Sequence, residues 1–180
     1  ATGNPAIVAD AKLLAEQLVR CKVILQNLAR AAEQPSDKLQ RIAIDEHLNE
    51  VLGHWRLLNP DIPLHKHFER VSGYIQVDST FEHAIINLLN NAAEASPKGI
   101  EISVLETKAK NAVTISILDH GTGVVIDAEN IGKPFVSTRG PGRGLGLFLS
   151  NATIERLGGN VMLQSRVGGG TLTTVTLPFA

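Results

Sequence analysis

The sequence predicts an α+β sandwich in which helices cover one face of a sheet, preceded by one long helix of the coiled-coil type. Three observations predict this fold. Near the N-terminus, apolar residues recur at alternating steps of four and three, which is the heptad pattern. Strand-like and helix-like segments then follow one another along the chain. Two pairs of adjacent strand-like segments are separated by short turns, which is typical of antiparallel hairpins.

Residues 5–33 are predicted to form the single long helix. Its apolar seam consists of Ile7, Ala11, Leu14, Leu18, Cys21, Leu25, Leu28 and Ala32. Such a seam needs a partner helix, because alone it would expose an apolar stripe to water. An ordinary amphipathic helix that packs on its own domain is the alternative. Cys21 is interpreted as a small core residue rather than as a reactive thiol.

Pro35 ends this helix, and shorter elements follow. Strands are expected at 38–44, 63–71, 74–78, 99–107, 112–119, 160–167 and 171–179, and helices at 46–58, 80–96 and about 143–157. Asp45 is expected to cap the first of these helices, and Asp78 and Ser79 the second. Residues 120–142 are rich in Gly and Pro and are expected to form a loop.

The composition limits the functions that the chain can have. With 180 residues, of which 43% are hydrophobic and 19% charged, it fits one globular domain with an additional segment. A net charge of −1 argues against nucleic-acid binding. The single cysteine excludes an intramolecular disulfide and favours a reducing compartment. The chain begins with Ala1, so we expect a fragment of a longer protein, although removal of an initiator Met would look the same.

A stripe of polar residues runs along the expected helix at 80–96. His83, Asn87 and Asn91 step by four and therefore share a face, apart from the apolar residues. Asparagine is a mediocre helix former, so two on one stripe suggest a function. Its side-chain oxygen is a hard neutral ligand that suits Mg²⁺ bound to phosphate. Solvent-facing amides are the alternative.

Two further segments have features of a nucleotide site. Asp119 ends a strand, where its carboxylate could accept a hydrogen bond from an adenine amino group, with Gly121 and Gly123 close behind; an ordinary Asp-led turn is the alternative. The stretch GPGRGLGLFLS at 140–150 leads into a helix N-terminus, which often binds phosphate. It lacks the Lys-Ser/Thr of a P-loop and the third glycine of a dinucleotide fingerprint, so a structural turn also remains possible.

Together these segments resemble a known family. The order N-L-L-x-N-A, D-x-G-x-G, K-P-F and G-x-G-L-G-L between Asn87 and Leu147 resembles the four boxes of the sensor histidine kinase ATP-binding domain. This domain has the Bergerat (GHKL) fold that DNA gyrase and the mismatch-repair ATPases share. The resemblance covers residues 36–180. It implies a mixed sheet with helices on one face, ATP and Mg²⁺ as cofactors, and a kinase of a two-component phosphorelay.

The resemblance also implies roles for individual residues. Asn91 would be the Mg²⁺ ligand, and Asn87 would contact phosphate or metal. Asp119 would bind the adenine amino group, Gly121 and Gly123 would shape the base pocket, and Thr171 would support the aspartate. Phe135 and Arg139 would belong to a mobile lid at about 125–142, with Arg139 reaching the γ-phosphate. Gly142, Gly144 and Gly146 would form the turn that lets Leu145 and the following helix approach the phosphates.

Asn87 bears on the type of reaction. Gyrase-like ATPases resemble this chain but have a glutamate at that position, where it acts as the base for water. An amide cannot take a proton from water, so we expect the chain to hold ATP for transfer rather than to hydrolyse it. A gyrase-like ATPase, a serine/threonine protein kinase of the anti-sigma type and a nucleotide sensor without transfer are the alternatives. Glu94 departs from one version of the asparagine box, which removes one possible phosphate contact.

The acceptor histidine of this family lies in an H-E-x-x-x-P-like sequence, and none of the six histidines does. Residues 1–35 are therefore interpreted as the second helix of a dimerisation and phosphotransfer hairpin, and 36–180 as the catalytic domain. The first helix, with its histidine, would lie upstream, so the chain is not expected to phosphorylate itself. Leu14–Arg30 resembles the matching helix of RegB-type redox sensor kinases.

The same resemblance implies partners and a location. The full-length protein would be a homodimer through the hairpin helices. Its catalytic domain would act on its own dimerisation domain, and the phosphate would pass to a response regulator. The domain would be cytoplasmic, and the whole protein would lie in the bacterial inner membrane through upstream segments, because no apolar run here approaches the roughly 20 residues of a span.

Overall fold

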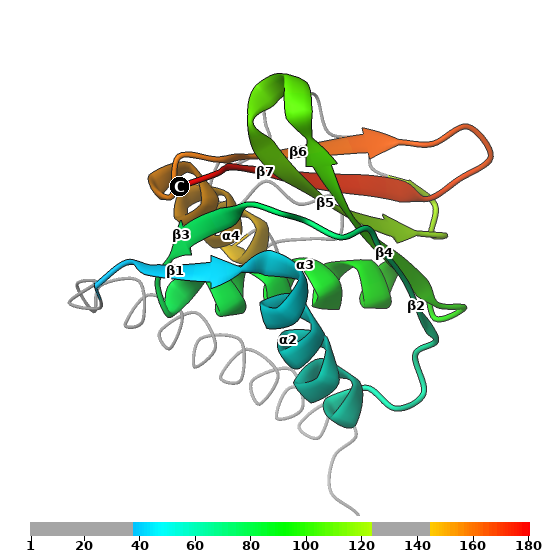
Figure 1. The fold of residues 1–180 in the computed structure, drawn as a ribbon. Coiled ribbons are helices and arrows are strands. Elements are labelled where there is room, and N and C mark those ends of the chain that lie inside the picture. The colour runs from blue at the N-terminus through cyan, green and yellow to red at the C-terminus, as the bar shows by residue number, and fades with distance from the viewer. Residues whose placement is uncertain (1–37, 124–144) are drawn as a thin grey trace, which may run out of the picture. The chain divides into compact units, whose positions relative to one another are not determined.

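The computed structural model describes residues 38–123 and 145–180 of the chain. The helix expected at 5–33 and the lid expected at 125–142 lie outside these residues. The elements are, in order, β1 (Gln40–Ala43), α2 (Ile44–Leu58), β2 (Leu64–Phe68), β3 (Tyr74–Val77), α3 (Thr80–Ala95), β4 (Ile100–Thr107), the 3₁₀ turn η1 (Lys108–Lys110), β5 (Ala112–Asp119), α4 (Leu145–Arg156), β6 (Asn160–Ser165) and β7 (Thr171–Pro178) (Figure 1).

A mixed five-stranded sheet forms the centre of the described part. Its strand order is β2-β4-β5-β7-β6, and β1 and β3 form a separate antiparallel pair. β2 and β4 are parallel, which requires a crossover, and the chain supplies it through β3 and α3. The other pairs in the sheet are antiparallel, and the hairpins predicted between β4 and β5 and between β6 and β7 are confirmed.

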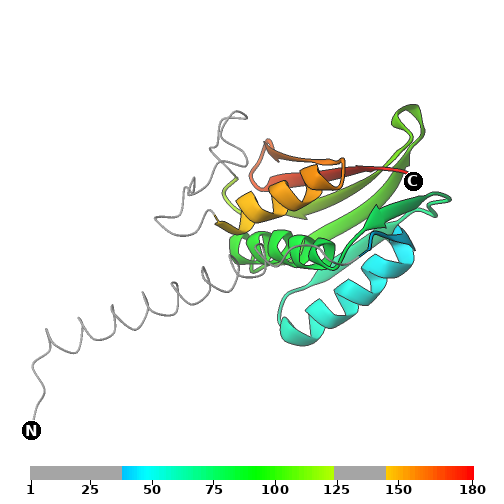
Figure 2. The same ribbon diagram turned by 90° about the vertical axis from the view of Figure 1, so that its left-hand side faces the viewer.

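One face of this sheet is buried under the helices. The side chains of Ile102, Ile115 and Val175, on three neighbouring strands, are fully buried, while the residues that alternate with them are only half-buried. This alternation is the pattern of a sheet with one covered face. Figure 2 shows α2, α3 and α4 together on the same side of the sheet. The expected α+β sandwich with helices on one face is therefore confirmed.

Two of the predicted helix caps need correction. α2 begins at Ile44, so Asp45 lies in the first turn, where its carboxylate accepts a hydrogen bond from the Glu46 amide. An acidic side chain there still favours the helix, because it faces the positive end of the dipole. At α3, Ser79 occupies the cap position without a side-chain cap bond. Asp78, one residue earlier, accepts hydrogen bonds from the amide and hydroxyl of Thr80.

No helix in residues 38–123 and 145–180 combines the length and the apolar character needed to cross a bilayer. α2 and α3 instead have one buried apolar face each. In α3, Phe81, Ile85 and Leu89 are fully buried, spaced so that they share one side of the helix. The opposite side of α3 is left for polar residues, which include the asparagines.

Candidate functional site

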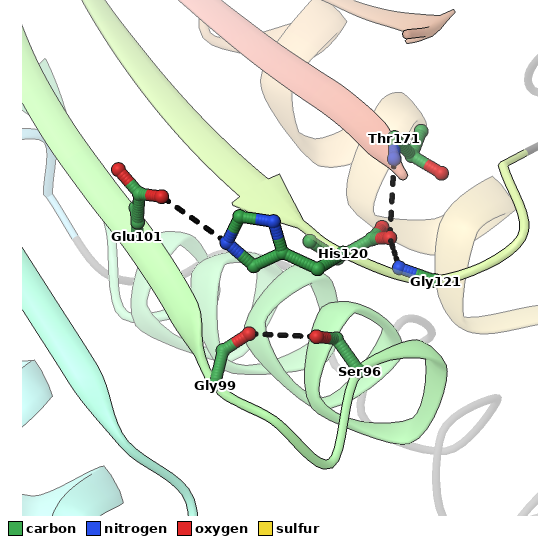
Figure 3. Close-up of polar contacts among 7 residues, drawn as sticks. Ser96, Gly99, Glu101, His120, Gly121 and Thr171 are labelled. Carbon is green, nitrogen blue, oxygen red and sulfur yellow. Dashed lines mark hydrogen bonds and ion pairs between the residues drawn. The ribbon is translucent and has the colours of Figure 1, made fainter. Parts of the chain in front are cut away.

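Asp119 lies at the C-terminal end of β5, in the middle of the sheet. The residue is buried, with only 5% of its surface exposed to solvent. One carboxylate oxygen, Oδ1, accepts hydrogen bonds from the amides of Gly121 at 2.8 Å and Thr171 at 3.1 Å (Figure 3). Both amides donate to Oδ1, and neither of these two hydrogen bonds involves the second oxygen, Oδ2. The result is a buried, oriented hydrogen-bond acceptor.

Thr171 contacts Asp119 as expected, but through the backbone. Thr171 is the first residue of β7, which pairs with β5, and its amide donates to the carboxylate. The support therefore depends on where β7 begins rather than on the threonine hydroxyl alone. Since any residue except proline has an amide, this contact could not be found from the residue type.

Gly170, next to Thr171, is a residue of this site that sequence reasoning missed. Its φ is +90°, which disfavours residues with a side chain, and a Cβ there would fall against the carbonyl oxygen of Asp119. Its amide also donates to the Gly121 carbonyl oxygen at 2.7 Å. The sequence predicts for Gly168, Gly169 and Gly170 only a short turn between the strands expected at 160–167 and 171–179. In the structure, Gly170 ties the start of β7 to the loop after β5.

Gly121 lies where this loop passes the C-terminal end of α3. A Cβ on Gly121 would be 2.7 Å from the carbonyl oxygen of Ala95, the last residue of α3, and 3.1 Å from Oδ1 of Asp119. Only glycine allows so close an approach. Gly123 follows, with the Ser165 hydroxyl 3.3 Å from the position that its Cβ would take. Gly121 therefore lies against Asp119, whereas Gly123 lies against Ser165 and the Gly170 carbonyl oxygen.

The rim of this region holds a second set of polar contacts. His120 Nε2 is 3.1 Å from Oε1 of Glu101 on β4, and both side chains are partly exposed (Figure 3). The Ser96 hydroxyl, which is buried, donates to the Gly99 carbonyl oxygen at 2.7 Å. These contacts hold the loop after β5 against β4 and close the turn between α3 and β4. They therefore fix the two segments beside Asp119.

The asparagines of α3 separate into two faces. Asn90 accepts a hydrogen bond from the indole N–H of buried Trp55 on α2, at 2.8 Å. Asn87 is half-buried and Asn91 exposed, one helical turn apart on another side of α3. The sequence analysis did not assign a role to Asn90. The only sign of one in the sequence is that two asparagines, Asn90 and Asn91, stand next to each other. Asn90 thus has a structural partner on α2, whereas Asn87 and Asn91 lie on a different side of the helix.

α4 runs antiparallel to α3. The Ser150 hydroxyl donates to the carbonyl oxygen of Ala84 at 3.1 Å, and Arg156, at the end of α4, contacts Asp78 just before α3. Figures 1 and 2 show the two helices side by side. Because α4 runs back along α3 from these contacts, its N-terminus lies beside the part of α3 between the middle and the C-terminus, where Asn87 and Asn91 are. The chain thus brings a helix N-terminus next to the asparagine face.

Gly146 lies in the first turn of α4. A Cβ at this glycine would meet no described atom within 4 Å, so the packing of the described residues does not itself require glycine there. The remaining predicted residues of the lid and turn, Phe135, Arg139, Gly142 and Gly144, lie outside the described residues. Leu145 is the first residue of α4.

This arrangement suits a ligand with a hydrogen-bond donor at one end and anionic oxygens at the other. Asp119 is a fixed acceptor, the asparagines offer hard amide oxygens, and a helix N-terminus attracts anions. Within 38–123 and 145–180, no group of three or more His, Cys, Asp or Glu side chains is placed to hold a metal ion.

Comparison with known proteins identifies the family. Residues 76–180 match the family described as histidine kinase-, DNA gyrase B-, and HSP90-like ATPase, which is more than half of the chain. Sporulation kinase C of Bacillus subtilis is 26% identical over 93% of this chain and 40% of its own length. Sporulation kinase A of the same organism is 30% identical over 90% of this chain and 28% of its own length. The chain thus spans less than half of these curated relatives.

A third relative and two solved structures agree with this. The C4-dicarboxylate transport sensor protein DctS of Rhodobacter capsulatus is 36% identical over 61% of this chain and 17% of its own length. The mycobacterial sensor histidine kinase MprB has the same fold, with a TM-score of 0.64 and 24% identity over 79% of this chain and 98% of that one. Full-length ShkA, solved with AMPPNP, gives a TM-score of 0.73 and 22% identity over 100% of this chain and 40% of that one.

The family match and the relatives select among the alternatives that the sequence left open. These relatives are named as kinases or as a sensor protein, and the gyrase-like and anti-sigma readings are not favoured. The chain therefore belongs to the family of histidine kinase-, DNA gyrase B- and HSP90-like ATPases, and it carries the ATP-binding catalytic domain of a sensor histidine kinase.

Proposed function

We propose that this domain holds Mg-ATP between Asp119 and the α3–α4 pair and positions the γ-phosphate for transfer to a histidine upstream of the chain. The observation that supports this most directly is the carboxylate of Asp119, which is buried and oriented by two backbone amides. An ionised carboxylate accepts hydrogen bonds at both oxygens, and the amino group of adenine is a donor. Oδ2 is the atom that we assign to this contact.

The phosphates would extend from this base pocket toward the start of α4. The amides of the first turn have no partners within the helix and carry partial positive charge, so they bind phosphate oxygens. Among the described residues, no atom lies within 4 Å of the position that a Cβ on Gly146 would take, and this leaves room for such an approach. Asn91 would hold Mg²⁺, which neutralises phosphate charge, and Asn87 would contact a phosphate or the metal. Phe135, Arg139, Gly142, Gly144 and Leu145 are assigned to the lid and the phosphate turn by resemblance.

Transfer rather than hydrolysis follows from the same face of α3. Asn87 has an amide where a water-activating base would need a carboxylate, and an amide does not accept the proton of an attacking water. Phosphoryl transfer depends mainly on positioning and on neutralisation of charge, which these residues supply. We therefore infer that the acceptor is a side chain presented to the domain rather than water.

The proposal for the whole protein goes beyond the domain. We infer that residues 1–35 are the second helix of a dimerisation and phosphotransfer hairpin, and that 36–180 are the catalytic domain. The full-length protein would be a homodimer that passes phosphate to a response regulator. Upstream segments would attach it to the bacterial inner membrane, with this domain in the cytoplasm. The RegB-type similarity of Leu14–Arg30 stays a prediction, because it lies outside the described residues.

Calorimetric titration with ATP tests the base contact. We expect Asp119→Asn to weaken Mg-ATP binding by roughly tenfold or more, because a hydrogen bond to a charged group contributes about 1.5–3 kcal/mol. Asp61→Asn is the matched control, because Asp61 is exposed and distant in sequence from the site. If the Asp119 variant binds ATP as tightly as the unmodified chain does, the assignment of the base pocket is wrong.

A transfer assay tests the reaction. The chain incubated with γ-labelled ATP should retain no label, and a protein that supplies the upstream helix with its histidine should acquire it. Steady release of inorganic phosphate that Asn91→Ala abolishes would instead support a true ATPase. Label on a serine of an added protein would support the serine/threonine kinase.

A further inference from the structure

Arg156, the last residue of α4, contacts two polar side chains at the start of α3, those of Asp78 and Thr80. Its Nη1 lies 2.6 Å from Oδ2 of Asp78, and its Nη2 donates to the Thr80 hydroxyl at 2.7 Å. The Thr80 hydroxyl in turn donates to Oδ1 of Asp78 at 2.6 Å. The three side chains therefore form a closed ring of hydrogen bonds at the N-terminal end of α3.

This ring is better defined than an ordinary surface ion pair. The Asp78 side chain is 1% exposed, while that of Arg156 is 40% exposed. Oδ1 of Asp78 also accepts the Thr80 amide at 3.0 Å, so the carboxylate is held by the start of α3 as well as by Arg156. The planar guanidinium contacts two different residues with its two terminal nitrogens, which fixes its orientation more tightly than one contact would.

The ring sets how far α4 extends along α3. Arg156 is fixed at Asp78 and Thr80, and Ser150, about one and a half turns earlier, is fixed at Ala84. From Arg156 to Leu145 the helix rises about 16 Å, which brings its N-terminus alongside the turn of Asn87 and Asn91. A slip by one turn would move that N-terminus by about 5.4 Å relative to the asparagines, more than the length of a hydrogen bond.

We propose that Arg156 is a positioning residue for the nucleotide phosphates: through Asp78 and Thr80 it sets the axial register of α4, and so the distance between the α4 N-terminus and Asn91. The inference rests on the proposed function, since it assumes that these two elements hold the phosphates together. Arg156 itself does not touch the nucleotide. It acts through the rigid helix between it and Leu145.

This role differs in a measurable way from general stabilisation. A pair that only stabilised the fold would change the unfolding midpoint and leave the affinity of the folded protein unaltered. If the pair sets the register, its removal lowers the affinity for phosphates but does not change the affinity for the base. This is because Asp119 is held by Gly121 and Thr171 and not by α4. The ratio of ATP to adenosine affinity therefore separates the two roles.

The experiment uses the whole 180-residue chain with Arg156→Gln, Arg156→Lys and a matched control, Arg70→Gln. Arg70 is exposed in the loop between β2 and β3, and its replacement removes the same charge. Mg-ATP affinity is measured by calorimetry, adenosine affinity by NMR titration, and folding by circular dichroism. We expect Arg156→Gln to lose about 3- to 30-fold in ATP affinity and less than twofold for adenosine. Arg156→Lys should be intermediate, and Arg70→Gln should match the unmodified chain.

Two results would overturn the proposal. One is a folded Arg156→Gln chain that binds Mg-ATP like the control, and the other is an equal loss for ATP and adenosine. If Arg156→Gln does not fold, Thr80→Val, which removes one partner of the guanidinium, carries the same comparison with the same expected ratio. Failure of the unmodified chain to bind ATP would contradict the proposed function instead, so the two failures are distinguishable.

Discussion

Gly170 illustrates how a residue without a side chain can shape a binding site. It has a positive φ of +90°, and the position of its missing Cβ is occupied by the backbone of Asp119. Two glycines earlier, Gly168 has nearly the same φ, +93°, but a Cβ there would meet no described atom within 4 Å. The two positions therefore share the same backbone strain and differ in the close approach to Asp119.

This difference predicts unequal effects of two alanine substitutions. Gly168→Ala should lose about 1–2 kcal/mol from the free energy of unfolding, because the left-handed conformation disfavours a side chain. Gly170→Ala should lose more and should also weaken ATP binding, because its methyl group displaces the backbone of Asp119. Urea unfolding, followed by the fluorescence of Trp55, the only tryptophan, measures the first effect. Equal losses at the two positions would contradict the close approach.

For Asp119, the sequence predicted the hydrogen-bond acceptor but not the groups that orient it. Its position at a strand end, followed by two glycines, predicted a hydrogen-bond acceptor beside a close backbone. The structure shows in addition that Asp119 is buried and accepts the Gly121 amide. The donors that orient it are backbone amides, one of them from β7, more than fifty residues later in the chain. No side-chain pattern encodes such a donor, so this half of the arrangement could not be predicted from residue types.

At the scale of elements, α3 has three faces, and each makes a different kind of contact. Phe81, Ile85 and Leu89 pack into the core, and Asn90 bonds to Trp55 of α2. Asn87 and Asn91 occupy a further side, next to the N-terminal half of α4. The helical period predicted the apolar and asparagine faces, because it depends only on spacing. It did not predict the Trp55 contact, because that depends on where α2 packs.

The neighbouring asparagines provide a matched pair of variants. Asn90→Ala should lower the free energy of unfolding by about 1 kcal/mol, since it leaves the buried indole N–H of Trp55 without its partner, and should leave Mg-ATP affinity unchanged. Asn91→Ala should leave the free energy of unfolding unchanged and should weaken Mg-ATP binding. The difference in ATP affinity from the unmodified chain should disappear when EDTA removes the metal. Unfolding by urea and calorimetric titration measure the two quantities. An Asn90→Ala chain with weakened ATP binding would contradict this division of faces.

For the described part of the molecule as a whole, the Asp78 ring links the pH to stability. Burial raises the pKa of Asp78, but the hydrogen bonds from Arg156 and Thr80 and the charge of Arg156 outweigh it and hold the pKa below its ordinary value of 3.8. A carboxyl whose folded pKa is lowered stabilises the fold fully above its unfolded pKa. That contribution is lost as the pH falls through the folded value.

The prediction concerns the difference in unfolding free energy between the unmodified chain and Asp78→Asn. This difference should be constant between about pH 5 and pH 7 and should shrink as the pH falls below about 4, because the protonated carboxyl then resembles the amide. Urea unfolding at each pH measures it, with Asp61→Asn as the exposed control. A difference that persists undiminished at about pH 2 would show that Asp78 is not held as an anion.

The sequence by itself determined the periodicities, the hairpins and the order of the four motifs, and these were sufficient to predict the sandwich, the family and the ATP-binding role. Such features depend on the spacing of residues along the chain, which is fully visible in the sequence. Only the tertiary structure decided which atoms orient Asp119, which asparagine is taken by Trp55, and where α4 lies along α3. These depend on contacts between segments far apart in the chain, in which backbone amides and one arginine fix positions that no local pattern records.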